Sequence, residues 1–303
     1  MGIKCVDKPL GLTSHDVVAR ARRLLGTRRI GHAGTLDPLA TGVLLVLVGE
    51  ATKLSSYLTG HDKSYLAWVS FGASTPTLDA EGPILETADA SSLSEAQVAA
   101  ALAPFLTLKE QAPPAYSAIK QDGQRSYAVA RRGETLDLPP RPVSYRSVTL
   151  TAFAARREDL PMSLGNELPT ALGEHPTALI ELTVSAGTYV RSFARDLGAA
   201  LGLPAHLSGL VRTSSGGVPL SAATPLADIS EAPDVPALEA LGLPLVRLSA
   251  AQTVAIKQGK REVLGLTERS ALIDPGGTLV ALAEPNAQDG SRIELLRVFM
   301  DGV

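Results

Sequence analysis

The 303-residue chain is 45 % hydrophobic and 19 % charged, a balance typical of soluble globular proteins. Its single cysteine, Cys5, excludes an internal disulfide and a cysteine-rich metal site. We expect a cytoplasmic location, because the sequence shows neither a signal peptide nor an apolar run of about 18 residues. The net charge of −3 does not indicate a nucleic-acid binder, although residues 1–60 hold eight Lys and Arg against four Asp and Glu. That local excess fits a phosphate-binding surface or solvated helix faces.

The first predicted elements are a strand at Ile3–Val6 and a helix from Ser14 to about Leu25. Ser14 is expected to cap this helix and Gly26 to end it. A basic cluster occupies the helix and its exit, and its members are Arg20, Arg22, Arg23, Arg28 and Arg29. Such a cluster suits a nucleic-acid phosphate or a solvated helix face, and the pattern favours neither.

The stretch Arg29–Lys53 places a lone acid, Asp37, before Pro38 and in front of the apolar run Val43–Val48. The run predicts a buried strand, and the proline makes the preceding loop rigid and extended. A rigid loop joined to a core strand can present a reactive carboxylate, although spacing alone favours an ordinary connection. The next acid, Glu50, follows the apolar run, so we expect any chemistry at Asp37 to proceed without a metal or a partner acid.

The rest of the pattern interleaves helices and strands. It predicts a helix at Ala51–Leu58, a strand at Tyr65–Phe71, a loop at 72–92 and a helix at Ser94–Leu106. Strands follow at Val143–Ala155 and Ala178–Ala186, on either side of a loop at 158–176. The chain then continues with a helix that Gly187–Arg191 opens and Leu201 ends, a strand at Leu207–Val218, and a helix plus linker at 221–246. Several successive strands lack a long crossover. The fold class is therefore α/β of the α+β type, with a mixed, mainly antiparallel central sheet and flanking helices.

Two segments stand apart from this pattern. Gln111–Leu138 interleaves basic residues with tyrosines and has few apolar anchors, which fits a mobile RNA-contacting lobe or an ordinary surface hairpin. From Arg247 the pattern changes to short strands and glycine turns, which indicates a small β-rich module. We therefore divide the chain into a domain at 1–246 and a C-terminal module at 247–303.

Several common sites are missing from the sequence. The five histidines are scattered, with no HExxH and no cysteine partner, so no zinc site is legible. There is no GxxxxGK[ST] phosphate loop, no strand-linked GxGxxG and no GxSxG serine elbow.

GHAGTLDPLATGVLLVLVGEATK at 31–53 closely resembles the signature loop of the TruB family of bacterial tRNA pseudouridine synthases, which isomerise the T-loop uridine at tRNA position 55. Further motifs of that family are matched by DKPLGLTSHDVV at 7–18, DKSYLAWVSFG at 62–72, PPAYSAIKQDGQRSYAVARRG at 113–133, SAGTYVRSFARDLG at 185–198 and LSGLVRTSSG at 207–216. The order of these motifs along most of the chain identifies it as a member. One departure is Pro76, which replaces an acid in the family's T-D-T-x-D-x-x-G loop, here Thr75–Gly82.

The resemblance implies a role for each of six residues. Asp37 would be the nucleophile, Arg191 its ion-pair partner, and Tyr65 the residue that stacks on the flipped uracil and helps proton transfer. Tyr189 and Leu210 would line the base pocket, and His32 would fill the space that the uridine leaves. It also implies the pseudouridine synthase fold, a thumb at about 111–138, no cofactor, no metal, and the T-arm of tRNA as partner. The tail resembles a PUA-type RNA-binding module loosely, through AQTVAIKQGKREV. We expect a monomer.

The isomerisation of uridine to pseudouridine requires the residue types found at these positions. Breaking the N-glycosidic bond, turning the base and rejoining it through carbon needs one carboxylate, acting by covalent attack or through a glycal-type intermediate. Burial can raise an Asp pKa by up to ~3–5 units and a nearby Arg lowers it by ~1–3. We therefore expect Arg191, with its bidentate fork, to keep Asp37 charged and oriented. Flipping the base costs a few kcal/mol, of which stacking on Tyr65 recovers roughly 1–3 kcal/mol.

Two other classes remain open at this stage. A non-catalytic tRNA-binding or folding protein on the same scaffold would keep its activity without Asp37, and would lose it without the basic residues. An enzyme acting on a small molecule through an Asp nucleophile would not bind tRNA in a salt-sensitive way. A guide-RNA-dependent relative would be more basic and carry a larger tail.

Overall fold

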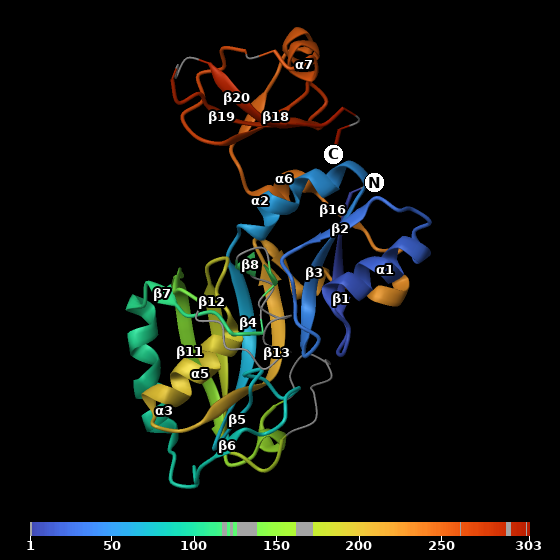
Figure 1. The fold of residues 1–303 in the computed structure, drawn as a ribbon. Coiled ribbons are helices and arrows are strands. Elements are labelled where there is room, and N and C mark those ends of the chain that lie inside the picture. Colours follow the sequence, from blue (N-terminus) through green and yellow to red (C-terminus); the bar gives the residue numbers. More distant parts are fainter. Residues whose placement is uncertain are drawn as a thin grey trace.

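In this computed structural model, the described residues are 2–116, 120–121, 124–125, 138–161, 172–260, 262–288, 292–300 and 302–303. They form one large sheet, a separate small sheet near the C-terminus, and helices against both (Figure 1). The large sheet has ten strands, with β11-β12-β4-β13-β3-β1-β15 in order and β2, β14 and β16 paired at its sides. Their bounds are β1 Ile3–Lys8, β2 Ile30–Ala33, β3 Ala40–Val48, β4 Lys63–Phe71, β11 Tyr145–Ala154, β12 Thr177–Val184, β13 Ala205–Ser215, β14 Val218–Pro219, β15 Thr224–Pro225 and β16 Asp234–Val235.

Strand β3 lies within the large sheet, and all nine of its residues are buried. It pairs antiparallel with β1 and β2 and parallel with β13. The β1–β15 pair is also parallel, whereas β11–β12, β12–β4 and β4–β13 are antiparallel. The predicted mixed, mainly antiparallel sheet is therefore confirmed.

Helices cover the sheet in two groups. Helix α1 (Ser14–Leu24) packs on β1, β2 and β3 through Val17, Val18 and Ala21. Helices α3 (Glu95–Leu102), followed by a 3₁₀ turn at Ala103–Thr107, and α5 (Val190–Ala200) lie over the half of the sheet built from β11, β12, β4 and β13 (Figure 1). Phe193 of α5 stacks edge-on against Phe105, with ring centroids 4.7 Å apart, in the largest core.

The start of α1 corrects one expectation. The N-cap is Thr13, whose side chain accepts from the backbone of Asp16 while Asp16 accepts from the backbone of Thr13, a complete capping box. Ser14 is the first helical residue, and its hydroxyl contacts Leu36 instead of capping the helix.

Three other elements differ from prediction. The helix expected at Ala51–Leu58 is a 3₁₀ helix at Gly49–Leu54 followed by α2 (Ser55–Thr59). The strand expected at Leu207–Val218 begins at Ala205 and ends at Ser215, where Gly216 turns the chain with a φ of 61°. Residues 221–246 form 3₁₀ turns (Leu220–Ala222 and Leu226–Asp228), short strands and a single α-helix, α6 (Ala237–Leu241), because prolines recur through this stretch.

Short elements complete the domain: β5 (Ala73–Ser74) pairs β6 (Glu86–Thr87), β7 (Glu110–Gln111) pairs β10 (Arg141–Pro142), β8 (Lys120–Gln121) pairs β9 (Gln124–Arg125), and a 3₁₀ turn spans Arg157–Asp159. The predicted thumb at about 111–138 lies mostly outside the described residues. No helix in the described part of the chain is long and apolar enough to cross a membrane.

The second sheet has the order β17-β18-β19-β20 and carries helix α7 (Ala250–Lys257). Its strands are β17 Leu245–Arg247, β18 Ser270–Ile273, β19 Leu279–Pro285 and β20 Ile293–Val298. This sheet lies beyond α2 and α6, next to the N-terminus (Figure 1). Leu279 and Phe299 share one core with Leu54 and Ala240, so the C-terminal sheet is packed onto the main domain.

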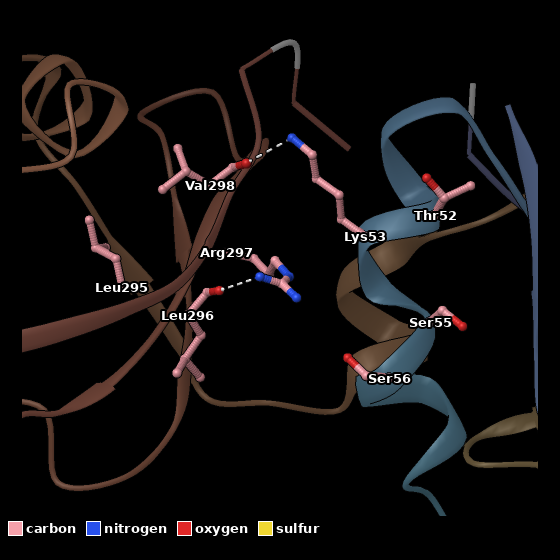
Figure 2. A pocket seen from close by; sticks show the side chains of 8 residues that line it. All are labelled: Thr52, Lys53, Ser55, Ser56, Leu295, Leu296, Arg297 and Val298. Atoms are coloured by element: carbon pink, nitrogen blue, oxygen red, sulfur yellow. Dashed lines mark hydrogen bonds between the residues drawn. The ribbon is translucent and has the colours of Figure 1, made fainter. Parts of the chain in front are cut away.

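A polar contact accompanies this apolar one. Glu50 is buried and faces Arg29 and Lys53, each with an N–O distance of 2.5 Å. Lys53 also donates to the Val298 carbonyl at 3.1 Å and lies 5.8 Å from the ring centre of Phe299. An open pocket of about 750 Å³ lies beside this contact, between α2 and β20 (Figure 2).

The shared core generates a stability prediction. Phe299→Ala removes a fully buried ring and should lower the free energy of unfolding by about 3–5 kcal/mol. Its neighbour Met300 is 57 % exposed, so Met300→Ala is the matched control and should change stability by less than about 0.5 kcal/mol. Denaturant unfolding of both variants measures the difference. Equal effects would contradict the assigned packing.

Candidate active site

The Asp37 loop joins β2 to β3, and its backbone is held from several directions. The Ser14 hydroxyl accepts from the Leu36 N–H at 2.8 Å and lies 3.2 Å from the Leu36 carbonyl. The Gly11 N–H donates to the Pro38 carbonyl at 2.9 Å. Because loop carbonyls and amides on both sides of Asp37 are bonded to other segments, the loop cannot move without breaking them.

A fully buried lysine supports the same loop. Lys8 donates to the Leu12 carbonyl at 2.5 Å and lies 3.4 Å from the Pro38 carbonyl. Burial lowers the pKa of Lys8 to about 8, and the nearby Asp37 charge opposes that shift. The cation therefore bonds backbone oxygens and adds positive potential beneath Asp37.

Asp37 and Arg191, far apart in sequence, are brought together by the fold. The Arg191 Nε lies 2.8 Å from the Asp37 Oδ2, and the side chain of Arg191 is 8 % exposed against 40 % for Asp37. The Nε–H forms no aligned hydrogen bond, so the contact is an ion pair. The expectation of a bidentate fork on Asp37 is wrong, because the Arg191 Nη1 and Nη2 donate to the carbonyls of Thr77 and Tyr116, each at 2.9 Å.

A second carboxylate, Asp79, shares the same guanidinium, which corrects the expectation that Asp37 has no acid nearby. Its Oδ2 lies 3.6 Å from the Arg191 Nε, and Asp79 is 2 % exposed. Burial raises the pKa of Asp79, while the Thr77 hydroxyl, 2.6 Å from its Oδ1, and Arg191 oppose the rise. Asp79 and Asp37 therefore both approach the Nε of Arg191, and the buried Asp79 helps to orient the guanidinium.

The Asp79 position was legible in the sequence, within the loop Thr75–Gly82. Leu78, immediately before Asp79, has a φ of 63°, a conformation that costs a leucine about 1–3 kcal/mol. Backbone bonds on both sides hold it there, because the Leu207 N–H donates to the Leu78 carbonyl and the Ala80 N–H donates to the Leu207 carbonyl, both at 3.0 Å. The strained turn aims Asp79 at Arg191.

The predicted pocket residues come from neighbouring elements. Tyr65 on β4 is 8 % exposed and pairs across the ladder with Arg212 of β13. Leu210, two residues earlier on β13, pairs with Ala40 at the start of β3 and is 6 % exposed. Tyr65 and Leu210 belong to one apolar core that also includes the residues flanking Asp37 and Pro38.

Tyr189 is the N-cap residue of α5, two positions before Arg191. Its N–H donates to the Gln111 Oε1 at 2.9 Å, and the Gln111 amide nitrogen donates to the Tyr145 hydroxyl at 2.9 Å. The first residue of the predicted thumb is therefore fixed to the helix that carries Arg191.

His32 lies on β2, the strand that leads into the Asp37 loop, with its ring 5.4 Å from that of His15 in an edge-to-face contact. Its Nδ1 is buried and has no hydrogen-bond partner among the residues that the structure describes. Burial, with the His15 and Arg212 charges, lowers the pKa of His32 to about 4. The histidine is therefore neutral at pH 7, and a neutral ring can stack on a base.

No group of three or more His, Cys, Asp or Glu side chains within the described residues is arranged to hold a metal ion. Glu81 is a further acid in this region, and burial together with the Asp79 and Asp37 charges raises its pKa.

The shift of His32 predicts a pH dependence of stability. Its pKa is lower in the folded state than the ordinary 6.5, so the unfolded chain binds the proton more readily. The stability that neutral His32 contributes is complete above pH 6.5 and is lost as the pH falls toward 4. Melting temperatures measured across this window should fall more steeply for the wild type than for His32→Phe. Parallel curves would contradict the assignment.

Comparisons with known proteins bear on this geometry. Residues 22–190 match the model of the TruB family pseudouridylate synthase N-terminal domain. The chain is 49 % identical over 312 aligned positions to tRNA pseudouridine synthase B of Thermus thermophilus, with 99 % of each chain covered. It is 48 % identical to tRNA pseudouridine synthase B of Deinococcus radiodurans, with 99 % of this chain and 100 % of that one covered.

Solved structures give the same fold. A Cbf5-Nop10-Gar1 complex matches with a TM-score of 0.69 and 23 % identity, covering 99 % of this chain and 85 % of that one. An H/ACA ribonucleoprotein bound to a substrate RNA containing 2′-deoxyuridine matches with a TM-score of 0.68, also at 23 % identity and with the same coverage. Because the family model spans more than half of the chain and near-full-length relatives are almost half identical, this chain belongs to the TruB family of tRNA pseudouridine synthases.

Proposed function

We propose that this enzyme converts the uridine at position 55 in the T-loop of tRNA to pseudouridine, with Asp37 as its nucleophile. The observation that carries the proposal is the ion pair of a half-exposed Asp37, in a loop held on both sides, with a buried Arg191. A carboxylate held against a fixed cation keeps its orientation when a substrate displaces water.

The pocket would receive the base after it leaves the RNA stack. Tyr65 supplies an aromatic face at its floor, and Leu210 and Tyr189 supply the walls. Stacking on Tyr65 recovers roughly 1–3 kcal/mol of the cost of flipping. His32 would occupy the position that the uridine vacates, which a neutral ring can do without bringing a charge into the base stack.

The reaction then exchanges one bond for another. The glycosidic C1′–N1 bond breaks with its electron pair left on N1, the uracil turns within the pocket, and a C1′–C5 bond forms. The proton on C5 is then removed to restore the ring, and N1 takes up a proton. Asp37 assists the break either by bonding covalently to the sugar or by taking a proton from it to give a glycal. Tyr65 lies on the strand beside β13 and is the residue we assign to help the final proton transfer.

Positively charged surface would hold the tRNA. The arginines of α1 and its exit are exposed, and we assign them to backbone phosphates. We assign the segment at about 111–138 to contact with the tRNA; its first residue, Gln111, accepts from the Tyr189 N–H. We propose residues 1–246 as the catalytic domain and 247–303 as a PUA-like RNA-contacting module, in an enzyme that works in the cytoplasm where tRNA is modified.

A non-catalytic tRNA-binding protein would not need this site. RNA binding alone requires neither a strained turn at Leu78 nor a buried Asp79 and Arg191 behind the Asp37 carboxylate. The geometry therefore favours the catalytic function.

One prediction of the proposed function concerns the nucleophile. Asp37→Asn should lower pseudouridine formation on an unmodified tRNA transcript by more than about 10³-fold, because an amide cannot attack or take the proton. Binding of the same transcript should persist. Asp228→Asn changes an exposed aspartate elsewhere and should keep wild-type activity. Full product from the Asp37→Asn enzyme would rule out the assigned chemistry.

Another prediction concerns the target uridine. A transcript with cytidine at position 55 should yield no pseudouridine with wild-type enzyme, and a transcript with cytidine in place of an anticodon-arm uridine should yield the normal amount. Mapping of the modified position in each product makes the distinction. Modification that survives the change at position 55 would place the target elsewhere.

A further inference from the structure

Arg212 is a buried arginine that the proposed chemistry does not use. It lies on β13, two residues after Leu210, and is 1 % exposed. Among the described residues no carboxylate lies within ion-pair distance of its guanidinium. A buried cation is costly unless its donors are bonded, so its hydrogen-bond partners explain why it is tolerated.

All three partners are backbone carbonyls that flank Asp37. The Arg212 Nη2 donates to the Gly34 carbonyl at 2.9 Å, and the Nη1 donates to the Thr35 carbonyl at 3.4 Å. The Nε donates to the Val43 carbonyl at 2.7 Å. One planar group therefore bonds the segment that enters the Asp37 loop and the strand that leaves it, and fixes their separation.

Glycines permit this close approach. Gly42 has a φ of 94°, and a Cβ there would lie 2.9 Å from the Arg212 backbone nitrogen and nearer still to its carbonyl oxygen. Gly34 has a φ of 75°, and a Cβ there would lie 3.3 Å from the Arg212 Nη1. At both ends of the Asp37 loop, a glycine therefore lets the backbone approach Arg212 closely: Gly34 approaches its guanidinium and Gly42 its backbone.

The backbone of Arg212 links the loop to the pocket. In the large sheet Arg212 pairs with Gly42 on one side and with Tyr65 on the other. The residue that bonds the carbonyls around Asp37 is therefore also the ladder partner of the proposed stacking tyrosine. A shift of its side chain would move the carboxylate relative to the base pocket.

We propose that Arg212 is a positioning residue for Asp37: its guanidinium ties together both arms of the Asp37 loop and holds the carboxylate in register with Tyr65 and Leu210. This inference rests on the proposed function. It predicts that Arg212 acts on the chemical step and not on the binding of tRNA, because its side chain is sealed beneath the loop.

The test compares Arg212→Met, which keeps the length and removes the donors, with Arg212→Lys, which keeps the charge and part of the hydrogen bonding. With enzyme in excess over tRNA, the single-turnover rate of Arg212→Met should fall by about 10–100-fold, as for a small misplacement of a reacting group. Arg212→Lys should recover part of that rate. The affinity of both variants for tRNA should stay at the wild-type value.

Arg157→Met is the matched control. Arg157 donates to the Ser208 carbonyl of the same strand at 2.7 Å, is half-buried, and does not touch the Asp37 loop. It should retain the wild-type rate. Melting curves for every variant ensure that rates are compared between folded enzymes.

Several results would overturn the inference: an unchanged single-turnover rate in Arg212→Met, a rate loss matched by an equal loss of tRNA affinity, or loss of the folded state in both Arg212 variants. The last would show that Arg212 supports the fold and does not aim the carboxylate. If the wild type forms no pseudouridine at position 55, the proposed function itself fails, and that result is independent of the Arg212 variants.

Discussion

The ion pair between Asp37 and Arg191 is the interaction around which the site is organised. Its two members come from a loop before β3 and from the first turn of α5, and neither segment could hold the pair alone. Arg191 is fixed by two carbonyls and by Asp79, so the freedom that remains belongs to the exposed carboxylate. The site is therefore rigid on its buried side and accessible on its substrate side.

Buried cations give the Asp37 loop its rigidity. Lys8 and Arg212 are fully buried, and each of their bonds goes to a backbone oxygen. A loop of this kind has no core of its own, so its carbonyls would otherwise need water. The two fixed cations bond these carbonyls in place of water, and they place positive potential beneath the Asp37 carboxylate.

Much of the fold and part of the site were predictable from local patterns. The unbroken aliphatic run of β3 and the absence of long crossovers were enough for a buried strand in a mixed sheet. The family motifs brought Asp37 and Arg191 into one site, which the ion pair agrees with. The Thr13 cap is itself legible as the Thr13–Asp16 spacing of a capping box, whereas the tertiary contact of the Ser14 hydroxyl with Leu36 is not.

Asp79 and Arg212 show the same limit within the site. Asp79 reaches Arg191 only because its turn is bonded to Leu207 on β13, a pairing between segments distant in the chain. Arg212 in a strand reads as an ordinary core or surface position until its acceptors are known. The motifs identified which residues the family uses, whereas the buried hydrogen bonds that aim them follow from packing alone.

Helix α2 has a consequence for how the chain can be divided. One side of it shares a core with Phe299 of the C-terminal sheet, and the hydroxyl of Ser55 on the same helix donates to the His32 carbonyl at 2.9 Å. A protein shortened before β17 would leave this helix with a bare apolar face directly behind the strand that carries His32. The two units are therefore distinct in chain order but packed together through α2. A minimal catalytic fragment would need a redesigned α2.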